Sequence, residues 1–258
     1  MVRTGIIDRP CFDANSDLKV IANRGAGFDD FEVAEAVRRG IRVFAPLLAI
    51  GKRTLYPDAL VRRGNWRRAI PRATQLCGRT MGIVGYGAIS ERMAALAAAF
   101  GMRAIEFDSE RANRISRQVW RRVALAELLE ECDLASLHVP PTDSRRNMID
   151  AAALASMKRG SILVNAAREG IVDEVSLVDA VDSGRLQGAG HDKFAMEPPG
   201  ESFAAARCNG ILLSPQIAGA TDESAPRMSM CCAQSVEQFL MQGTRSDSLV
   251  NFSWDARC

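Results

Sequence analysis

Histidine is scarce in this chain, with two copies, His138 and His191, in 258 residues. The seven cysteines are scattered, and no two of them form a CxxC pair. A zinc site or a histidine-based catalytic triad therefore has little to be built from. The cysteines are typical of reduced, packed thiols rather than of a disulfide framework. We therefore expect no metal site.

Long apolar runs and a strong net charge are also missing. No stretch approaches the roughly 20 apolar residues needed to span a bilayer, and the N-terminus lacks a signal-peptide pattern. The net charge of +2 does not suggest nucleic acid. We expect arginine patches such as Arg62 and Arg63 to be solvated faces. These absences predict a cytoplasmic protein with neither a membrane nor a nucleic-acid partner.

A glycine-bearing stretch, residues 80–100, is the most informative part of the sequence. A short apolar run breaks at Gly85 and Gly87, and the pattern then becomes helical, which predicts a strand, a tight turn and a helix. No Ser, Thr, Asp or Asn precedes the helix as a cap, so the N–H groups around Ala88 and Ile89 are left available for a pyrophosphate. An ordinary strand-to-helix turn is the alternative interpretation.

A second apolar strand follows and ends in Asp108. An acidic residue about 20 residues beyond the glycines is placed to hydrogen-bond a ribose 2′-hydroxyl, which favours NAD over NADP. Ser90 takes the place of the third glycine of GxGxxG. We expect this serine to loosen the helix slightly against the strand.

Strands and helices alternate along most of the chain, which predicts an α/β fold with a doubly wound, mostly parallel sheet. We expect a Rossmann NAD-binding domain over 67–221 and a reduced substrate domain formed by 1–66 plus 222–258. A helix with Pro57 near its start or at a kink is expected within 46–66. The strands expected are 18–22, 41–45, 81–84, 104–107, 134–139, 161–164, 186–190 and 211–213. The later helices expected are 125–132, 151–157, 175–183 and 223–241.

Polar residues and glycines follow several of these strands, as in HVPPT, NAAREG, GHDKF and SPQIAGAT. Parallel strands bring their carboxyl ends to one edge of the sheet, where ligands of such folds bind. Ordinary loops are also polar, so the pattern favours a binding edge without proving it.

Between Leu18 and about Gly243 the chain resembles the D-isomer-specific 2-hydroxyacid dehydrogenases, a family that includes phosphoglycerate dehydrogenase-like enzymes. The resemblance implies an NAD-dependent oxidoreductase that interconverts a small 2-keto acid and a D-2-hydroxy acid, with a flavodoxin-like substrate domain. The matching stretches are LKVIANRGAGFDDFEV, RGIRVFAP, GNW, LCGRTMGIVGYGAI, FGMRAIEFD, LEECDLASLHVPPT, MKRGSILVNAAREGIVDEVSLVDAVDSGRLQGAG, HDKFAMEPP and ILLSPQIAGAT.

The same resemblance assigns roles to individual residues. Arg168 matches the arginine that pairs with the substrate carboxylate and polarises the carbonyl, and an arginine suits this role because its planar fork holds two oxygens. Glu197 matches the glutamate that keeps a histidine protonated, and Asp192 matches the aspartate at the nicotinamide carboxamide. The substrate cradle matches Gly25, Ala26 and Gly27. The expected cofactor contacts are Gly85, Gly87, Ala88, Ile89, Asp108, Pro140, Thr142, Ala166, Arg168, Asp192 and Gly219.

One departure from the family pattern concerns the chemistry. Gln216 stands where the family has its catalytic histidine, and an amide has no proton to exchange near neutral pH. The sequence offers three candidates for a substitute acid. Strand alternation is expected to send His191 into the core and Lys193 away from Asp192, while His138 is expected near the adenosine end.

Two further departures concern length. The chain starts later than family members do, and part of the helix that joins the two domains and helps to form the family's dimer is missing between residues 46 and 66. We therefore expect an intact NAD-binding half and an eroded substrate half, and a homodimer stays open. The alternatives to an impaired dehydrogenase are an inactive NAD(H)-binding sensor or scaffold, and a truncated product that folds poorly.

Overall fold

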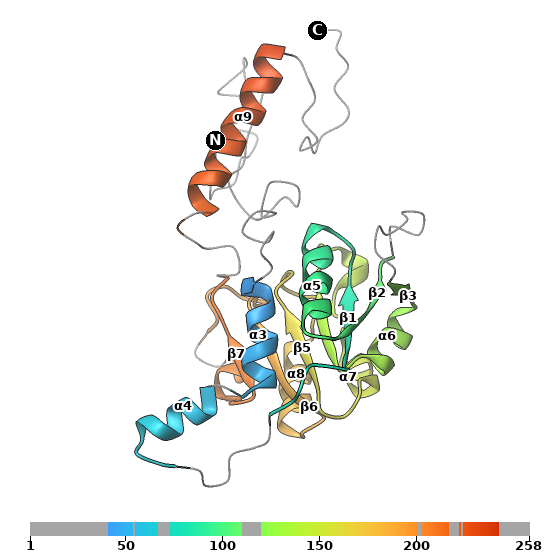
Figure 1. The fold of residues 1–258 in the computed structure, drawn as a ribbon, viewed down its shortest axis with the longest axis vertical. Helices are drawn as coiled ribbons and strands as arrows, with labels where there is room; N and C mark the ends of the chain where they lie inside the picture. The colour runs from blue at the N-terminus through green and yellow to red at the C-terminus, as the bar shows by residue number, and fades with distance from the viewer. Residues whose placement is uncertain are drawn as a thin grey trace. The chain divides into compact units, whose positions relative to one another are not determined.

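The computed structural model describes residues 41–53, 55–66, 73–109, 120–200, 203–216, 222 and 224–242 of the 258-residue chain (Figure 1). Contacts divide the chain into two compact units, 1–38 with 219–258, and 39–218. The described part of the first unit contains helix α9, Ser224–Gln242. Among the described residues, no helix is long and apolar enough to cross a membrane.

A seven-stranded parallel sheet forms the centre of the second unit. Its spatial order is β3-β2-β1-β4-β5-β6-β7, so the chain starts in the middle of the sheet, builds outward to one edge and then returns to build the other. This order is that of a doubly wound Rossmann sheet, and the predicted fold class is confirmed. The strands are β1 Thr80–Val84, β2 Arg103–Phe107, β3 Arg121–Arg122, β4 Leu134–Leu137, β5 Ser161–Asn165, β6 Leu186–His191 and β7 Ile211–Leu213.

Helices cover both faces of this sheet (Figure 1). On one face α3 packs on β5 and β6, and α5 packs on β1 and β2. On the other face α6 packs on β1 and β2, α8 packs on β6, and α7 lies between α6 and α8. The helices of this unit are α3 Ile41–Gly51, α4 Leu55–Arg62, α5 Ala88–Ala99, α6 Leu125–Glu131, α7 Ala151–Ser156 and α8 Glu174–Asp182, with the 3₁₀ turns η1 Asp143–Arg145 and η2 Ala204–Arg207.

The apolar residues of the strands are divided between the two faces. In β5, Ile162 and Val164 join the core under α3 and α5, whereas Leu163 joins the core under α6, α7 and α8. This alternation explains why every residue of the strand is buried. The continuous apolar run seen in the sequence is thus the signature of a strand covered on both faces.

Helix α3 replaces a predicted strand. The strand expected over 41–45 is wrong, because these residues begin a helix that runs to Gly51 with Pro46 inside it. Phe44 and Leu47 are buried on the side of α3 that joins the sheet core. Glycines in β6 make room for the helix, since a Cβ added at Gly188 would lie 2.7 Å from the Ile50 Cγ2 atom. The expected helix between 46 and 66 appears as the end of α3 and as α4, with Pro57 in the first turn of α4.

The remaining predicted strands and helices within the described residues form close to their expected bounds. The strand expected over 18–22 lies outside the described residues. The predicted division into 1–66 plus 222–258 and 67–221 stays a prediction about domains. In the structure, α3 is part of the same compact unit as the sheet.

Candidate functional site

The turn between β1 and α5 requires glycine at its first position. Gly85 has a φ of 95°, and a Cβ there would lie 2.6 Å from the His138 carbonyl oxygen. Its N–H donates to the Phe107 carbonyl at 2.7 Å, which ties the turn to the end of β2. The turn is therefore held between the carboxyl ends of the two neighbouring strands.

The start of α5 is open, as the sequence predicted. Its N-cap is Gly87, which supplies no side-chain hydrogen bond, whereas α7 and α8 are capped by the carboxylates of Asp150 and Asp173. A Cβ at Gly87 would meet no atom within 4 Å. The first N–H groups of α5, those of Ala88 and Ile89 among them, thus lie at the positive end of a helix without a side-chain cap. A pyrophosphate fits this arrangement.

Ser90 binds the turn more closely than expected. Its hydroxyl is buried and donates to the Gly85 carbonyl at 2.6 Å. The serine therefore links the first turn of α5 directly to the glycine turn. A loosened helix was expected from the missing third glycine, and this hydrogen bond acts in the opposite direction.

Asp108 directly follows β2 and points its carboxylate to the same turn. Its Oδ2 accepts a hydrogen bond from the Tyr86 N–H at 2.9 Å. The carboxylate thus stands beside the glycines at the carboxyl edge of the sheet, where a ribose hydroxyl would be bound. The geometry agrees with the predicted use of NAD.

An arginine that no sequence motif singled out organises the loop after β4. Arg145 is 6% exposed and donates to the Pro140 carbonyl at 3.2 Å and to the Ser109 hydroxyl at 3.0 Å. Pro140 and Thr142, two predicted cofactor contacts, are exposed in this loop. Arg145 therefore fastens the loop to the segment that follows Asp108.

His138, at the start of the same loop, is held neutral. Burial lowers its pKa to about 4, and its Nε2 lies 2.8 Å from the Ser136 hydroxyl. A neutral imidazole with so low a pKa carries no exchangeable charge near pH 7. His138 is thus unsuited to act as a proton donor near neutral pH.

The loop that carries Arg168 is folded by the side chain of Asn165, the last residue of β5. The amide of Asn165 accepts from the Ala167 N–H at 3.2 Å and donates to the Arg168 carbonyl at 3.1 Å. Arg168 is half-buried, and one guanidinium nitrogen donates to the Ala167 carbonyl at 2.8 Å. Ala166, a predicted cofactor contact, lies in the same loop.

Asp192 links this loop to the end of β7. The residue is 6% exposed, its N–H donates to the Asn165 carbonyl at 3.0 Å, and its carbonyl accepts from the Gln216 N–H at 3.2 Å. Its carboxylate also accepts a hydrogen bond from the Ser214 hydroxyl. The structure therefore brings Arg168's loop, Asp192 and Gln216 together at one edge. Ser214 was missed from the sequence, although it directly precedes the PQ that marks the family position.

Glu197 and Gln216 do not form a pair. Both side chains are exposed, and the Glu197 carboxylate accepts from the Phe194 N–H at 3.2 Å. Within the described part of the chain no hydrogen bond joins these two residues. Gln216 has a φ of 51°, in the left-handed region. The pairing of these two positions that the resemblance implies is therefore not seen among the described residues.

His191 lies in the core, as strand alternation predicted. It is buried, its Nε2 lies 3.2 Å from the Glu174 Oε1 atom, and its ring meets Phe194 edge-on at 5.4 Å. Burial acts to raise the pKa of Glu174, but the bonds from His191 and from the Ala195 N–H outweigh it and lower that pKa. His191 is therefore engaged in packing next to the site rather than aimed into it.

Several predicted residues cannot be placed. Gly25, Ala26, Gly27 and Gly219 lie outside the described residues, so the expected substrate cradle stays a prediction. Lys193 is buried, and the expectation that it points away from Asp192 stays untested. Among the described residues, no three His, Cys, Asp or Glu side chains gather into a group that could hold a metal ion.

Two family models together account for most of the chain. Residues 44–218 match the NAD binding domain of D-isomer specific 2-hydroxyacid dehydrogenase, and residues 1–46 match its catalytic domain. The chain belongs to this family. The family predicted from the sequence is confirmed, and NAD is the cofactor of the domain formed by residues 44–218. The contacts predicted at Gly85 and Asp108 stay predictions.

Individual relatives agree with this assignment. The chain is 35% identical over 268 residues to a glyoxylate reductase of Korarchaeum cryptofilum, which covers 96% of this chain and 80% of the relative. It is also 35% identical over 246 residues to D-3-phosphoglycerate dehydrogenase of Mycobacterium leprae. This match covers 89% of this chain and 46% of that relative. The chain thus spans about half the length of the second relative.

Solved structures share the fold. The TT0316 protein of Thermus thermophilus is 30% identical, with a TM-score of 0.79 over 93% of this chain and 81% of that one. A D-lactate dehydrogenase of Aquifex aeolicus complexed with NAD and lactic acid is 26% identical, with a TM-score of 0.76 over 92% of this chain and 82% of that one. The chain described here is an NAD-dependent oxidoreductase of this family.

Proposed function

We propose that the protein interconverts a small 2-keto acid and its D-2-hydroxy acid with NAD(H), at a rate limited by Gln216. The observation that carries this proposal is the hydrogen-bonded series from Asn165 through Asp192 to Gln216. This series holds the loop of Arg168 and the family's proton-donor position at one edge of the sheet. Relatives named glyoxylate reductase and hydroxypyruvate reductase support a small substrate.

Arg168 is the residue that we expect to orient the substrate. Its planar guanidinium can hold a carboxylate through two parallel hydrogen bonds. Its loop is rigid because Asn165 bonds both to the Ala167 N–H and to the Arg168 carbonyl. The Gly25 to Gly27 turn would complete the cradle for the carboxylate.

Reduction of a keto acid needs a hydride at the carbonyl carbon and a proton at the carbonyl oxygen. Bound NADH supplies the hydride. The Gln216 amide can donate a hydrogen bond to the oxygen but cannot release a proton, so the proton must come from water. Gln216 is exposed, which allows water to reach this position. General acid catalysis typically contributes about 10²- to 10⁴-fold, and this is the factor that we expect the protein to lack.

An NADH titration followed by a set of keto acids tests the proposal. NADH binding is measured by fluorescence, and glyoxylate, hydroxypyruvate and pyruvate are then added while NADH absorbance is recorded. Slow, substrate-dependent oxidation of NADH supports the proposal. Binding without any oxidation would instead indicate an NAD(H)-binding protein without catalysis, and an absence of binding would contradict both functions.

The variant Gln216→His tests the role of the missing histidine. Because Glu197 is retained, we expect the new imidazole to act as a general acid and to raise kcat for keto-acid reduction by about 10²-fold or more. The rate of the variant should fall as pH rises through the pKa of that histidine. Gln216→Asn, which keeps an amide, is the matched control and should gain nothing. An unchanged rate in Gln216→His would show that proton donation does not limit the reaction.

We also propose a cytoplasmic homodimer. Among the described residues the free cysteines Cys77, Cys132, Cys208 and Cys232 suit a reducing compartment. The homodimer is supported only by the family pattern. Light scattering on the purified full chain measures the assembly, and fractionation of cells measures the location.

A further inference from the structure

A second polar site lies at the amino edge of the sheet, opposite to the cofactor edge. A hollow of about 440 Å³ is lined there by residues that precede or begin strands. Arg79 precedes β1, Asp133 precedes β4, and Lys158 and Arg159 precede β5. A five-residue strand spans roughly 15 Å, so this hollow is separated from the Gly85 turn by the length of the sheet.

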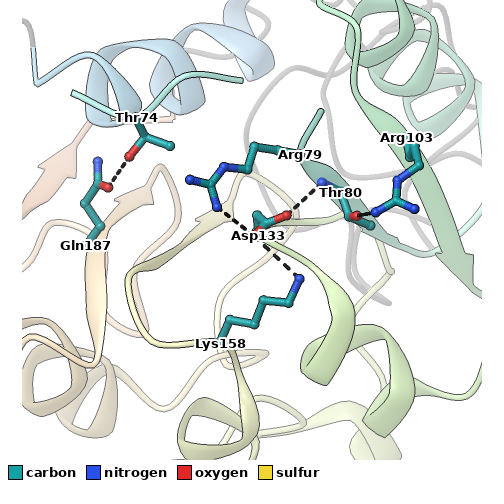
Figure 2. A network of polar contacts seen from close by, with 7 residues as sticks. All are labelled: Thr74, Arg79, Thr80, Arg103, Asp133, Lys158 and Gln187. Atoms are coloured by element: carbon teal, nitrogen blue, oxygen red, sulfur yellow. Dashed lines mark hydrogen bonds and ion pairs between the residues drawn. The ribbon is translucent and has the colours of Figure 1, made fainter. Parts of the chain in front are cut away.

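Asp133 organises the cations of this hollow (Figure 2). Its Oδ1 lies 3.2 Å from Arg79 Nη1 and 3.5 Å from Lys158 Nζ. Its Oδ2 accepts from the Thr80 N–H at 2.8 Å. Both carboxylate oxygens are therefore in use, and the two cations are held side by side by one negative charge.

The hollow has an excess of positive charge. Its lining contains the three cations Arg79, Lys158 and Arg159 and the single carboxylate of Asp133, which leaves a net charge of +2. Within the described part of the chain, Arg159 forms no hydrogen bond or ion pair. An anion of charge −2 would balance the site.

A buried hydroxyl at the same hollow has no hydrogen-bond partner among the described residues. It belongs to Ser161, which is 2% exposed and lines the hollow. A buried polar atom without a partner costs stability unless a ligand or water satisfies it. The neutral polar residues Thr74 and Gln187 also line the hollow, and the Thr74 hydroxyl donates to the Gln187 amide oxygen at 2.5 Å (Figure 2).

We propose that this hollow is a binding site for a phosphate dianion, either free phosphate or the phosphate group of a small ester. Lys158 and Arg159 supply the charge, Arg79 is positioned by Asp133, and the Ser161 hydroxyl donates a hydrogen bond to a phosphate oxygen. The site is separate from the cofactor edge, so cofactor and anion can be bound together.

The nearby Arg185 shows how a merely structural cation behaves. Its guanidinium donates to the carbonyls of Ala155 and Met157 at the carboxyl end of α7, where it offsets the negative end of the helix. Arg159 makes no such bond, and Lys158 is held by a carboxylate instead. Stabilisation of a helix end therefore does not explain why Lys158 and Arg159 lie at the hollow.

Calorimetric titration of the NAD⁺-saturated protein tests the proposal. Saturation with NAD⁺ keeps phosphate away from the start of α5, which is also an anion site. Sodium phosphate and glycerol 3-phosphate are titrated separately, with sodium chloride at matched ionic strength as the blank. Saturable heat from sodium phosphate but not from glycerol 3-phosphate indicates that free phosphate is the ligand. Tighter binding of glycerol 3-phosphate than of phosphate indicates that the ligand is a phosphorylated metabolite.

Three variants locate the site. In the double variant Lys158→Gln with Arg159→Gln we expect phosphate affinity to fall by about tenfold or more, because charged hydrogen-bond donors are lost. Ser161→Ala should lower the affinity by about fivefold while the melting temperature stays the same or rises. Arg63→Gln removes an exposed cation from the end of α4 and is the matched control, with unchanged affinity.

The opposite results would overturn the site. One such result is the absence of saturable heat from both titrants. A second is equal phosphate affinity in the double variant and in Arg63→Gln. A third is phosphate binding that is present without NAD⁺ and disappears when NAD⁺ is added. Failure of NAD⁺ itself to bind would contradict the cofactor assignment. The phosphate titration of the cofactor-free protein and its variants would still report on the hollow, because Lys158, Arg159 and Ser161 lie outside the cofactor edge.

Discussion

At the scale of the residue, Arg145 shows a role that the sequence concealed. The run DSRRN contains two adjacent arginines, and nothing in its pattern tells which of them is buried. In the structure Arg145 is buried and Arg146 is exposed. Only the folded chain brings Pro140 and Ser109, 31 residues apart in the numbering, to the same guanidinium. Tertiary contacts of this kind have no local signature.

Replacing Arg145 by methionine should weaken cofactor binding. The substitution keeps the apolar stem and removes the hydrogen bonds that join the Pro140 loop to Ser109. We expect the Kd for NADH, measured by fluorescence, to rise about tenfold, and the Kd for ADP-ribose to rise by a similar factor. Arg146→Met is the matched control and should bind NADH as the unmodified protein does. Equal affinity in both variants would show that the loop needs no such fastening.

His138 should make the protein sensitive to acid. Its pKa is about 4 in the folded chain and about 6.5 in the unfolded chain. Between these two pH values the unfolded state therefore binds a proton at His138 and the folded state does not. Stability is therefore unaffected above about pH 6.5 and falls as pH drops from there towards 4. Urea unfolding at pH 7 and pH 4.5 should show about 2 kcal/mol more loss in the unmodified protein than in His138→Gln. Parallel losses in the two proteins would contradict this assignment.

At the scale of the element, the two glycines of the β1–α5 turn should separate folding from binding. Gly85→Ala places a Cβ against the His138 carbonyl at positive φ and should cost at least about 2 kcal/mol of unfolding free energy. Gly87→Ala meets no protein atom and should cost about 1 kcal/mol or less, because alanine is a poorer N-cap than glycine. Its methyl group would stand in the pyrophosphate space, so NADH binding should weaken while the melting temperature holds. If Gly87→Ala bound NADH normally, the pyrophosphate would lie elsewhere.

The same scale shows which elements the sequence could predict. The strands β1, β4 and β5 were evident because a strand covered on both faces leaves a continuous apolar run between turn residues. Helix α3 was mistaken for a strand because its first turn, IRVFA, is rich in β-formers and Pro46 looked like an end. The helical spacing from Phe44 to Leu47 and Gly51 continues past that proline, and it is this face that meets the sheet. Packing on glycines of β6 decided the outcome.

At the scale of the whole molecule, the cofactor half of the site was predictable and the rest was not. Gly85, Gly87 and Asp108 lie in contiguous motifs whose spacing reflects one local unit, so pattern alone was enough to predict them as cofactor contacts. The network of Asn165, Asp192, Ser214 and Gln216 joins the ends of three strands, and it depends on sheet order, which sequence spacing does not encode. The expected substrate cradle at Gly25 to Gly27 lies outside the described residues and stays a prediction.

The left-handed backbone at Gln216 bears on whether the chain could accept a histidine at this position. Histidine is among the few residues other than glycine that adopt positive φ with some frequency, so the conformation at φ 51° would accept an imidazole without rebuilding the loop. Glutamine and histidine codons differ only in their third base. A single base substitution would therefore be enough to place a histidine at this position.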